Sequence, residues 1–259
     1  MEYSWLIAPV LVGLCALVAN IILGRQVLKR GVIFIDLAMA QIAALGVLAV
    51  ELSVGHTSVA LSSKLLASWL LTVPAALLLS KLEQRVNQHL EALIGLLYVL
   101  AACLAVLLVS HNPHGKEMIA SLINGRLLWS GFGDVIPVLT VALALVAIQI
   151  WRDNWLSGRS FYILFAIAVP PLVMSLGVYL EFASLIIPAL AVVKLNHRPM
   201  WLGAVTVGMV GGIGGFYASL ILDYPVGPCV VLCMAVTGFV YAIMVSPKVA
   251  KRTHQPVTD

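Results

Sequence analysis

The sequence has little charge and lacks any polar stretch long enough to form a soluble domain. Only 10% of its 259 residues are charged, 62% are hydrophobic, and the mean hydropathy is +1.06. Apolar runs recur from one end to the other, without the alternating ten-residue pattern of a membrane β-barrel. Helices must then satisfy the backbone in lipid. We therefore expect an all-α, polytopic transmembrane helical bundle that forms a single domain over residues 1–259.

Motifs for enzymatic chemistry are absent as well. The sequence contains no Walker loop, no nucleophile elbow and no metalloprotease pair of histidines, so we expect that the chain is not an enzyme. Its basic residues are spread over short loops, which argues against a nucleic-acid partner. All four cysteines lie inside apolar segments, so no disulfide framework is expected. Cys229 and Cys233, four residues apart, either pack in the core or bind a soft metal.

Nine apolar segments are candidate membrane spans. The segment 160–193 is too long for one span, and Pro170, Pro171 and Gly177 within it predict a tight hairpin of two short helices. The first apolar segment lacks the features of a cleaved signal peptide and is expected to be retained. The count is nine spans, or eight if one short helix only re-enters. The nine segments are 5–24, 32–52, 64–80, 92–110, 133–151, 160–177, 178–193, 201–222 and 226–245.

The distribution of basic residues predicts the orientation. With the N-terminus outside, twelve of the fifteen lysines and arginines fall on the inner side. This matches the positive-inside rule and favours nine spans over eight, because only an odd number places the basic C-terminal cluster inside. We expect the N-terminus outside and the C-terminus inside.

A carboxylate, Asp36, follows soon after the basic cluster that ends at Arg30. If one helix ran through both, Asp36 would lie roughly 9 Å inward from Arg30. A carboxylate at that depth costs about 2.5–3.5 kcal/mol on insertion scales, so it is a functional candidate. The alternatives are that Asp36 pairs with Arg30 or caps a broken helix.

A second carboxylate, Glu181, interrupts an otherwise apolar run. It either takes part in transport or extends to the outer surface. Carboxylate oxygen and imidazole are usual ligands of hard and borderline divalent cations, and His56 is one further polar group of this kind. The residues expected along a metal translocation path are Asp36, Gln41, Glu51, Glu181 and Asp223.

An outer loop carries two imidazoles and a carboxylate. His111 and His114 are separated by a turn-forming Asn-Pro pair, and Glu117 follows. The loop (residues 111–117, here the histidine loop) is either a metal-receiving site or an ordinary polar loop. The segment 121–129 after it is too short to span and is expected at the outer interface, anchored by Trp129.

The segment 201–222 contains two pairs of glycines at the spacing that allows close helix packing. The pairs are Gly208/Gly212 and Gly211/Gly215. They serve packing within the chain or form a dimer interface.

Three motifs occur in the order of a known family: Arg30-Gly…Phe34-Ile…Gly46, Leu185-Ile-Ile-Pro188-Ala189 and Asp223-Tyr-Pro-Val-Gly227-Pro228. With them, the chain resembles the membrane permease subunits of bacterial zinc/manganese/iron ABC importers, the ABC-3 metal permease family. The resemblance extends over nearly the whole length, and the segment around Gly125 also resembles the outer re-entrant region of that family.

The resemblance implies a function and partners. It implies a multi-pass protein of the bacterial inner (plasma) membrane that forms a homodimer, binds a cytoplasmic ATP-hydrolysing subunit and receives metal from a periplasmic or surface metal-binding protein. The cargo would be a divalent metal ion, with zinc first and manganese or iron next, moved by alternating access, and no cofactor would be bound permanently. Two alternatives stay open: a permease for a metal chelate or other small solute, and an ion-coupled secondary carrier.

The chain departs from the family pattern at two places. The family's paired Asp and His are replaced by Leu37 and Gln41, with Asp36 one position earlier. The segment 151–159 (here the coupling segment) is shorter than the usual coupling region, so coupling to the ATPase is expected to use it together with residues 188–199. The residues expected at the ATPase contact are Ser157, Arg159, Lys194, Asn196, His197 and Arg198.

Overall fold

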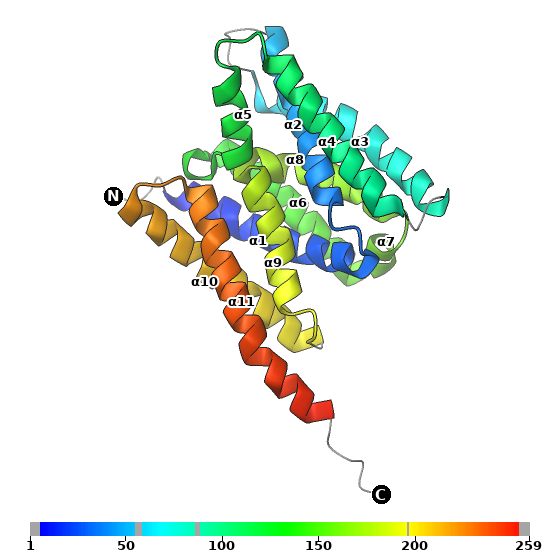
Figure 1. Ribbon diagram of the computed structural model, residues 1–259, viewed down its shortest axis with the longest axis vertical. Coiled ribbons are helices and arrows are strands. Elements are labelled where there is room, and N and C mark those ends of the chain that lie inside the picture. Colours follow the sequence, from blue (N-terminus) through cyan, green and yellow to red (C-terminus); the bar gives the residue numbers. More distant parts are fainter. Residues whose placement is uncertain (1–5, 55–58, 86–88, 196, 254–259) are drawn as a thin grey trace, which may run out of the picture.

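The computed structural model describes residues 6–54, 59–85, 89–195 and 197–253, and within them every regular element is helical (Figure 1). The predicted all-α fold is confirmed. The elements are α1 (Ile7–Arg30), α2 (Ile35–Val54), α3 (Leu61–Arg85), α4 (Leu90–Val109), α5 (Gly115–Asn124), the 3-10 turn η3 (Leu127–Trp129), α6 (Phe132–Trp151), α7 (Asp153–Ser157), α8 (Ser160–Leu176), α9 (Val178–Ala191), α10 (His197–Leu222) and α11 (Val226–Thr253).

Seven helices in the described part of the chain are long and apolar enough to cross a membrane: α1, α2, α3, α4, α6, α10 and α11. The pair α8 and α9 passes the same test together but is bent by 116°, which gives eight crossings if the pair is one broken span. The preferred count of nine requires each of these short helices to cross alone. Large apolar side chains such as Leu70 and Leu202 are about three-quarters exposed, 74% and 73%, as expected of surfaces that face lipid. The chain is a multi-pass membrane protein, and its orientation stays a prediction.

The bend between α8 and α9 lies at Gly177, where a turn was predicted. Gly177 has φ 81°, a conformation that suits glycine, and its N–H donates to the carbonyl of Val173 at 2.7 Å. Pro170 and Pro171 lie buried inside α8, within the segment 160–177 that the sequence predicts as the first short helix. Prolines are tolerated in membrane helices where the surrounding protein satisfies the freed backbone groups.

The segment between α5 and η3 is pressed against this bend. A Cβ added to Gly177 would lie 2.2 Å from the Gly125 nitrogen, and one added to Gly125 would lie 2.0 Å from the Leu176 carbonyl oxygen. The N–H of Arg126 donates to the Ser175 carbonyl at 3.2 Å. The segment 121–129 comprises the end of α5 and the turn η3, and Gly125 between them is in contact with the start of α9.

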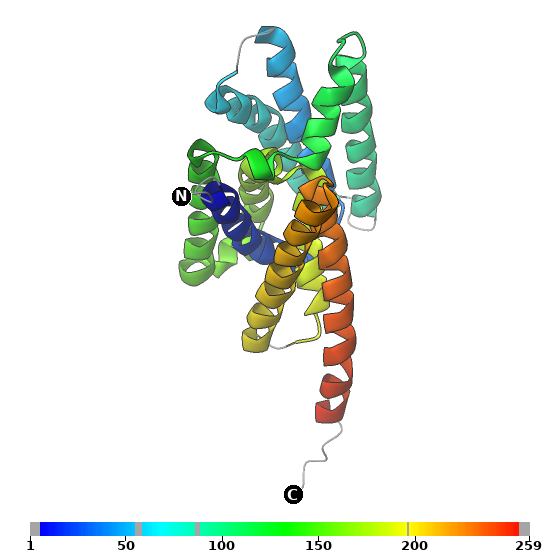
Figure 2. The ribbon, with the colours of Figure 1, turned by 90° about the vertical axis from the view of Figure 1, so that its left-hand side faces the viewer.

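Helices α1 and α8 form the centre of the molecule. α8 carries the largest fully buried side chains, Phe161, Tyr162 and Phe165, and it packs against α3 and α2. α1 packs between α6 and α9, while α10 and α11 lie side by side as a hairpin at one end of the molecule (Figures 1 and 2).

Three of the four paired glycines of α10, Gly208, Gly211 and Gly215, serve packing within the chain, whereas Gly212 has no atom within 4 Å of an added Cβ. A Cβ on Gly211 would lie 2.6 Å from Cα of Met234, and one on Gly215 would lie 2.3 Å from Cα of Val230. Both of these neighbours belong to α11, so the Gly211/Gly215 row lets the two backbones approach closely. Gly208 faces the Leu17 side chain of α1.

Candidate translocation site

The helix that carries Asp36 starts just before it. α1 ends at Arg30 and is capped by Gly31, which adopts a left-handed conformation (φ 69°) and donates its N–H to the carbonyls of Val27 and Leu28. α2 begins at Ile35, so Asp36 lies in its first turn. The assumption of one helix running from Arg30 through Asp36 was wrong. The positive dipole end of α2 favours a carboxylate at this position.

Asp36 is fully buried and has no hydrogen-bond partner among the described residues. Its exposed fraction is 0%, and both carboxylate oxygens lack a partner. The alternative pairing with Arg30 is wrong, because the Arg30 guanidinium forms its ion pair with Glu83 on α3. A buried carboxylate left without protein donors in this way is a candidate ligand.

Glu181 is also fully buried, in the first turn of α9. Its Oε2 accepts a hydrogen bond from the Asn20 side-chain amide at 2.9 Å, and that amide also donates to Ser184 Oγ at 2.7 Å. Ser184 in turn donates to the Glu181 carbonyl at 3.0 Å. The alternative in which Glu181 extends to the outer surface is therefore wrong.

The two carboxylates belong to one site. Asp36 lies in the first turn of α2 and Glu181 in the first turn of α9, and these two helices pack against each other. Four acceptor oxygens of this group are buried without a hydrogen-bond donor in the described part of the chain: Asn20 Oδ1, both oxygens of Asp36, and Glu181 Oε1. We call Asn20, Asp36, Glu181 and Ser184 the buried acidic cluster. Two carboxylates removed from water need a positive charge or protons beside them.

Sequence reasoning missed Asn20 and Ser184. Asn20 is a strongly polar side chain in the middle of an apolar 24-residue helix, and it is 0% exposed. Amide side chains inside membrane helices commonly bond to another helix, so this residue carried a signal in the sequence. Ser184 carried none, because serine is common in such helices.

An apolar cavity reaches the cluster at Ser184. The cavity has a volume of about 240 Å³ and lies between α1, η3, α9, α10 and α11. Ser184 is the one polar side chain that lines it, while residues such as Leu17, Leu180 and Met209 form the rest of its wall.

The other expected path residues do not join this cluster. Gln41 is half-buried on α2, and Glu51, further along the same helix, is paired with Lys64 Nζ of α3. Asp223 is exposed at the α10–α11 turn, with a positive φ of 54°. His56 lies outside the described residues. No group of three or more His, Cys, Asp and Glu side chains suited to a metal occurs among the residues that the structure describes.

The histidine loop is exposed and satisfied locally. His114 Nδ1 lies 3.1 Å from Glu117 Oε2, and these two side chains are 65% and 80% exposed. His111 is exposed, and its Nδ1 lies 3.1 Å from Ser110 Oγ. The structure places all three predicted residues on one surface loop and the start of α5, and the metal-receiving role stays a prediction.

The coupling segment contains a short helix, α7, anchored by the fully buried Leu156. Trp151, Trp155 and Arg159 are exposed around it. The expected contribution of residues 188–199 is corrected at its start, because Pro188 and Ala189 are buried inside α9, whereas Lys194 is exposed. Ser157 ends α7, His197 and Arg198 begin α10, and Asn196 lies outside the described residues.

Comparison with known proteins gives a family match and similar solved structures. Residues 157–246 match the model of the ABC 3 transport family. The chain is similar to PsaBC from Streptococcus pneumoniae, solved in complex with Fab, with a TM-score of 0.74 and 15% identity over 95% of this chain and 96% of that chain. It is also similar to an inward-facing structure assigned to the metal-chelate type of ABC transporter, with a TM-score of 0.52 and 16% identity over 93% of this chain and 77% of that one. At these identities the two structures establish a shared fold.

Proposed function

We propose that this chain, whose predicted resemblance to the ABC-3 permeases is confirmed by the family match over residues 157–246, is the permease subunit of an ABC importer for a divalent metal ion. The observation that carries the proposal is the buried acidic cluster. Two helices that pack against each other, α2 and α9, each carry a fully buried carboxylate in the first turn, and four oxygens of the cluster lack a donor among the described residues. A divalent cation would supply the missing positive charge and bind those oxygens.

The ligand atoms bear on which metal is carried. The cluster offers carboxylate, amide and hydroxyl oxygens, whereas zinc prefers imidazole and thiolate in its protein sites. Oxygen ligands suit hard cations such as manganese, so we rank manganese ahead of zinc as the cargo, which changes the order expected from the sequence. Gln41, at the position of the family's histidine, is an amide, so α2 has no imidazole at that position.

The proposed assembly is a homodimer of this chain in the bacterial plasma membrane, with a cytoplasmic ATPase pair and an extracytoplasmic metal-binding protein. Hydrolysis belongs to the ATPase, and this chain provides the path. In an alternating-access cycle, the first turns of α2 and α9 would hold the ion while access changes from one side to the other. The start of α9 is set by the Gly125–Gly177 contact, so movement of α5 would reach Glu181 through that contact.

The test is ATP-dependent uptake by the purified permease–ATPase complex in proteoliposomes. Manganese and zinc uptake should require ATP, and Asp36→Asn should abolish uptake while the complex still assembles. Glu51→Gln is the matched control, because Glu51 is on the same helix but is already paired with Lys64. Equal uptake by Asp36→Asn and wild type would contradict the proposed cargo site.

A secondary carrier is the second candidate, because two fully buried carboxylates on helices that pack together also suit proton binding, and no third His, Cys, Asp or Glu groups with them among the described residues. The same proteoliposomes separate the two functions. Uptake driven by a proton gradient in the absence of the ATPase would favour the carrier. Competition by a metal chelate, with no uptake of the free ion, would favour the chelate permease.

A further inference from the structure

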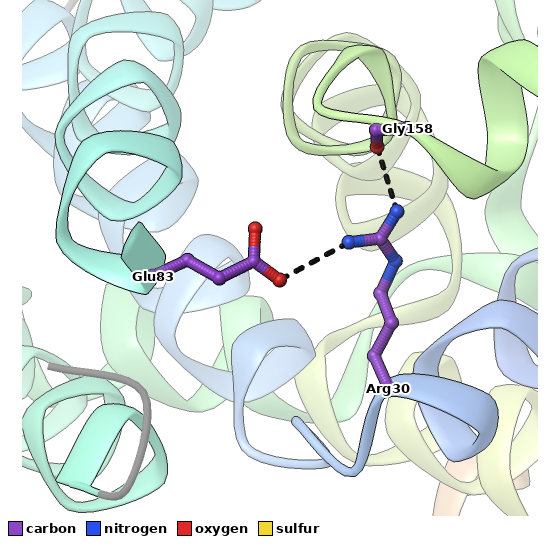
Figure 3. A network of polar contacts seen from close by, with 3 residues as sticks. All are labelled: Arg30, Glu83 and Gly158. Atoms are coloured by element: carbon purple, nitrogen blue, oxygen red, sulfur yellow. Dashed lines mark hydrogen bonds and ion pairs between the residues drawn. The ribbon is translucent and has the colours of Figure 1, made fainter. Parts of the chain in front are cut away.

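The last residue of α1 joins three helical elements. Arg30 Nη1 lies 3.3 Å from Glu83 Oε1 at the end of α3, and Nη2 donates to the Gly158 carbonyl at 2.6 Å (Figure 3). Its Cζ lies 4.7 Å from the ring centroid of Phe161, in the first turn of α8. The guanidinium thus lies among the end of α1, the end of α3 and the junction of α7 with α8.

This contact is enclosed and geometrically specific. The Arg30 side chain is 14% exposed and that of Glu83 is 27% exposed. The planar guanidinium directs separate N–H groups to the carboxylate and to the carbonyl while its face covers the aromatic ring. A lysine ammonium has no second nitrogen and no planar face, so it cannot reproduce the arrangement.

One of these partners belongs to the segment expected to contact the ATPase. Gly158 lies in the coupling segment directly after α7, and its carbonyl also accepts the N–H of Phe161 at 3.2 Å. Leu156, two residues earlier, is fully buried. The carbonyl is therefore held between α7 and the start of α8. Movement of α7 would displace the acceptor of the Arg30 guanidinium.

The other side of the contact leads directly to the acidic cluster. Only residues 31–35 separate Arg30 from Asp36, and they form a tight connection in which the Ile35 N–H donates to the Val32 carbonyl at 3.3 Å. Within this connection, the N–H of Phe34 donates to Glu91 Oε1 on α4 at 3.0 Å. This short, hydrogen-bonded connection can absorb little displacement. A shift of the end of α1 is therefore expected to move the first turn of α2.

We propose that Arg30 is a positioning residue that transmits movement of the coupling segment to the first turn of α2, where Asp36 lies. The proposal rests on the proposed function, since it needs a coupling segment moved by an ATPase. It assigns Arg30 no contact with the cargo. Removing the guanidinium should uncouple ATP hydrolysis from transport, while all side chains of the acidic cluster remain present.

The experiment compares Arg30→Gln and Arg30→Lys with Lys29→Gln in the reconstituted permease–ATPase complex. Lys29 is the exposed neighbour on the same helix turn, so the control removes the same charge without touching the contact. We expect Arg30→Gln to raise the number of ATP molecules hydrolysed per ion imported by at least about tenfold. Arg30→Lys should show most of this rise in the ATP-to-ion ratio, because it keeps the charge beside Glu83 but loses the planar pair of N–H donors. Lys29→Gln should match wild type.

A second measurement needs neither metal nor ATP. Hydrogen exchange of the purified permease should become faster in Arg30→Lys in both residues 31–38 and residues 156–162, and in neither segment in Lys29→Gln. Faster exchange in one segment alone, or an unchanged ATP-to-ion ratio in both Arg30 variants, would overturn the proposal. If Arg30→Gln does not fold, the same two criteria apply to Arg30→Lys. A wild-type complex without ATP-dependent uptake would refute the proposed function instead, and the exchange result would still decide whether the two segments are linked.

Discussion

Two groups of polar residues in this molecule contrast sharply. The histidine loop presents His111, His114 and Glu117 within seven residues of sequence, all exposed to solvent. The buried acidic cluster draws Asp36 and Glu181 from distant parts of the chain, both 0% exposed. The histidine loop has the more zinc-like residues, and the acidic cluster has the more demanding environment.

The contrast shows that the environment of a residue is stronger evidence for a functional site than the residue type. An exposed imidazole close to a carboxylate is stable with or without a metal. It has little effect on the free energy of folding, so its presence alone does not indicate a function. A carboxylate without a donor in an apolar interior is unfavourable in the empty protein and becomes favourable when a cation binds. The acidic cluster therefore carries the functional argument, and the histidine loop at most assists it.

The largest expected effect comes from breaking the bend that presents Glu181. Gly177→Ala would combine a positive φ with a Cβ 2.2 Å from the Gly125 nitrogen, so we expect a loss of stability of about 4 kcal/mol or more. Gly31→Ala has a similar φ but no atom within 4 Å and should cost about 1–2 kcal/mol. Gly212→Ala, with neither problem, should be neutral or stabilising. Thermal unfolding in detergent checks this order, and equal melting of the Gly177 and Gly212 variants would contradict the account of the bend.

Replacing the second carboxylate should remove most transport. Glu181→Gln keeps the shape and the hydrogen bond from Asn20 but removes the charge that binds the ion. We expect initial uptake to fall by more than about 100-fold, since direct ligands should exceed the 10–100-fold effect of their supporting residues. Normal expression and ATPase binding should accompany the loss, and retained uptake would restrict Glu181 to a structural role.

Asn20→Leu tests the support of the cluster. The change removes the 2.9 Å hydrogen bond to Glu181 and one buried oxygen, and we expect a loss of about 10–100-fold in uptake. Ser184→Ala, which leaves the Asn20–Glu181 bond in place, should have a smaller effect. The measurement is the dependence of uptake rate on metal concentration, and an unchanged half-saturating concentration in Asn20→Leu would speak against a role for the amide.

The smallest effect is expected in the histidine loop. Replacing His111 and His114 together with alanine should slow uptake by about threefold at limiting metal and have no effect at saturating metal, because local capture adds to the encounter rate only. Uptake that falls equally at both concentrations would show that the loop belongs to the path itself. That result would reverse the ranking of the two regions.

The sequence predicted much of the fold because apolar runs and basic clusters report on spans directly. The lone carboxylates Asp36 and Glu181 were identified because each interrupts an apolar run. The break before α2 was also readable, since Arg30-Gly31 has the basic last turn and glycine typical of a helix end. What the sequence could not supply was the pairing of distant residues.

That pairing depends on packing over long separations. Asn20 and Glu181 are 161 residues apart in sequence, and Arg30 and Glu83 are 53 apart. No helical or strand periodicity relates these positions in sequence, because both contacts depend on how the helices cross and not on local geometry.

The central claim is that Asp36 and Glu181 hold the same ion, and a double-mutant cycle in ATP-driven manganese uptake tests it most directly. Uptake is measured for wild type, Asp36→Asn, Glu181→Gln and the double variant in matched proteoliposomes. If both carboxylates serve one site, the double variant should retain about the same residual uptake as either single variant. Losses that multiply in the double variant, or an Asp36→Asn complex that transports at the wild-type rate, would contradict the account.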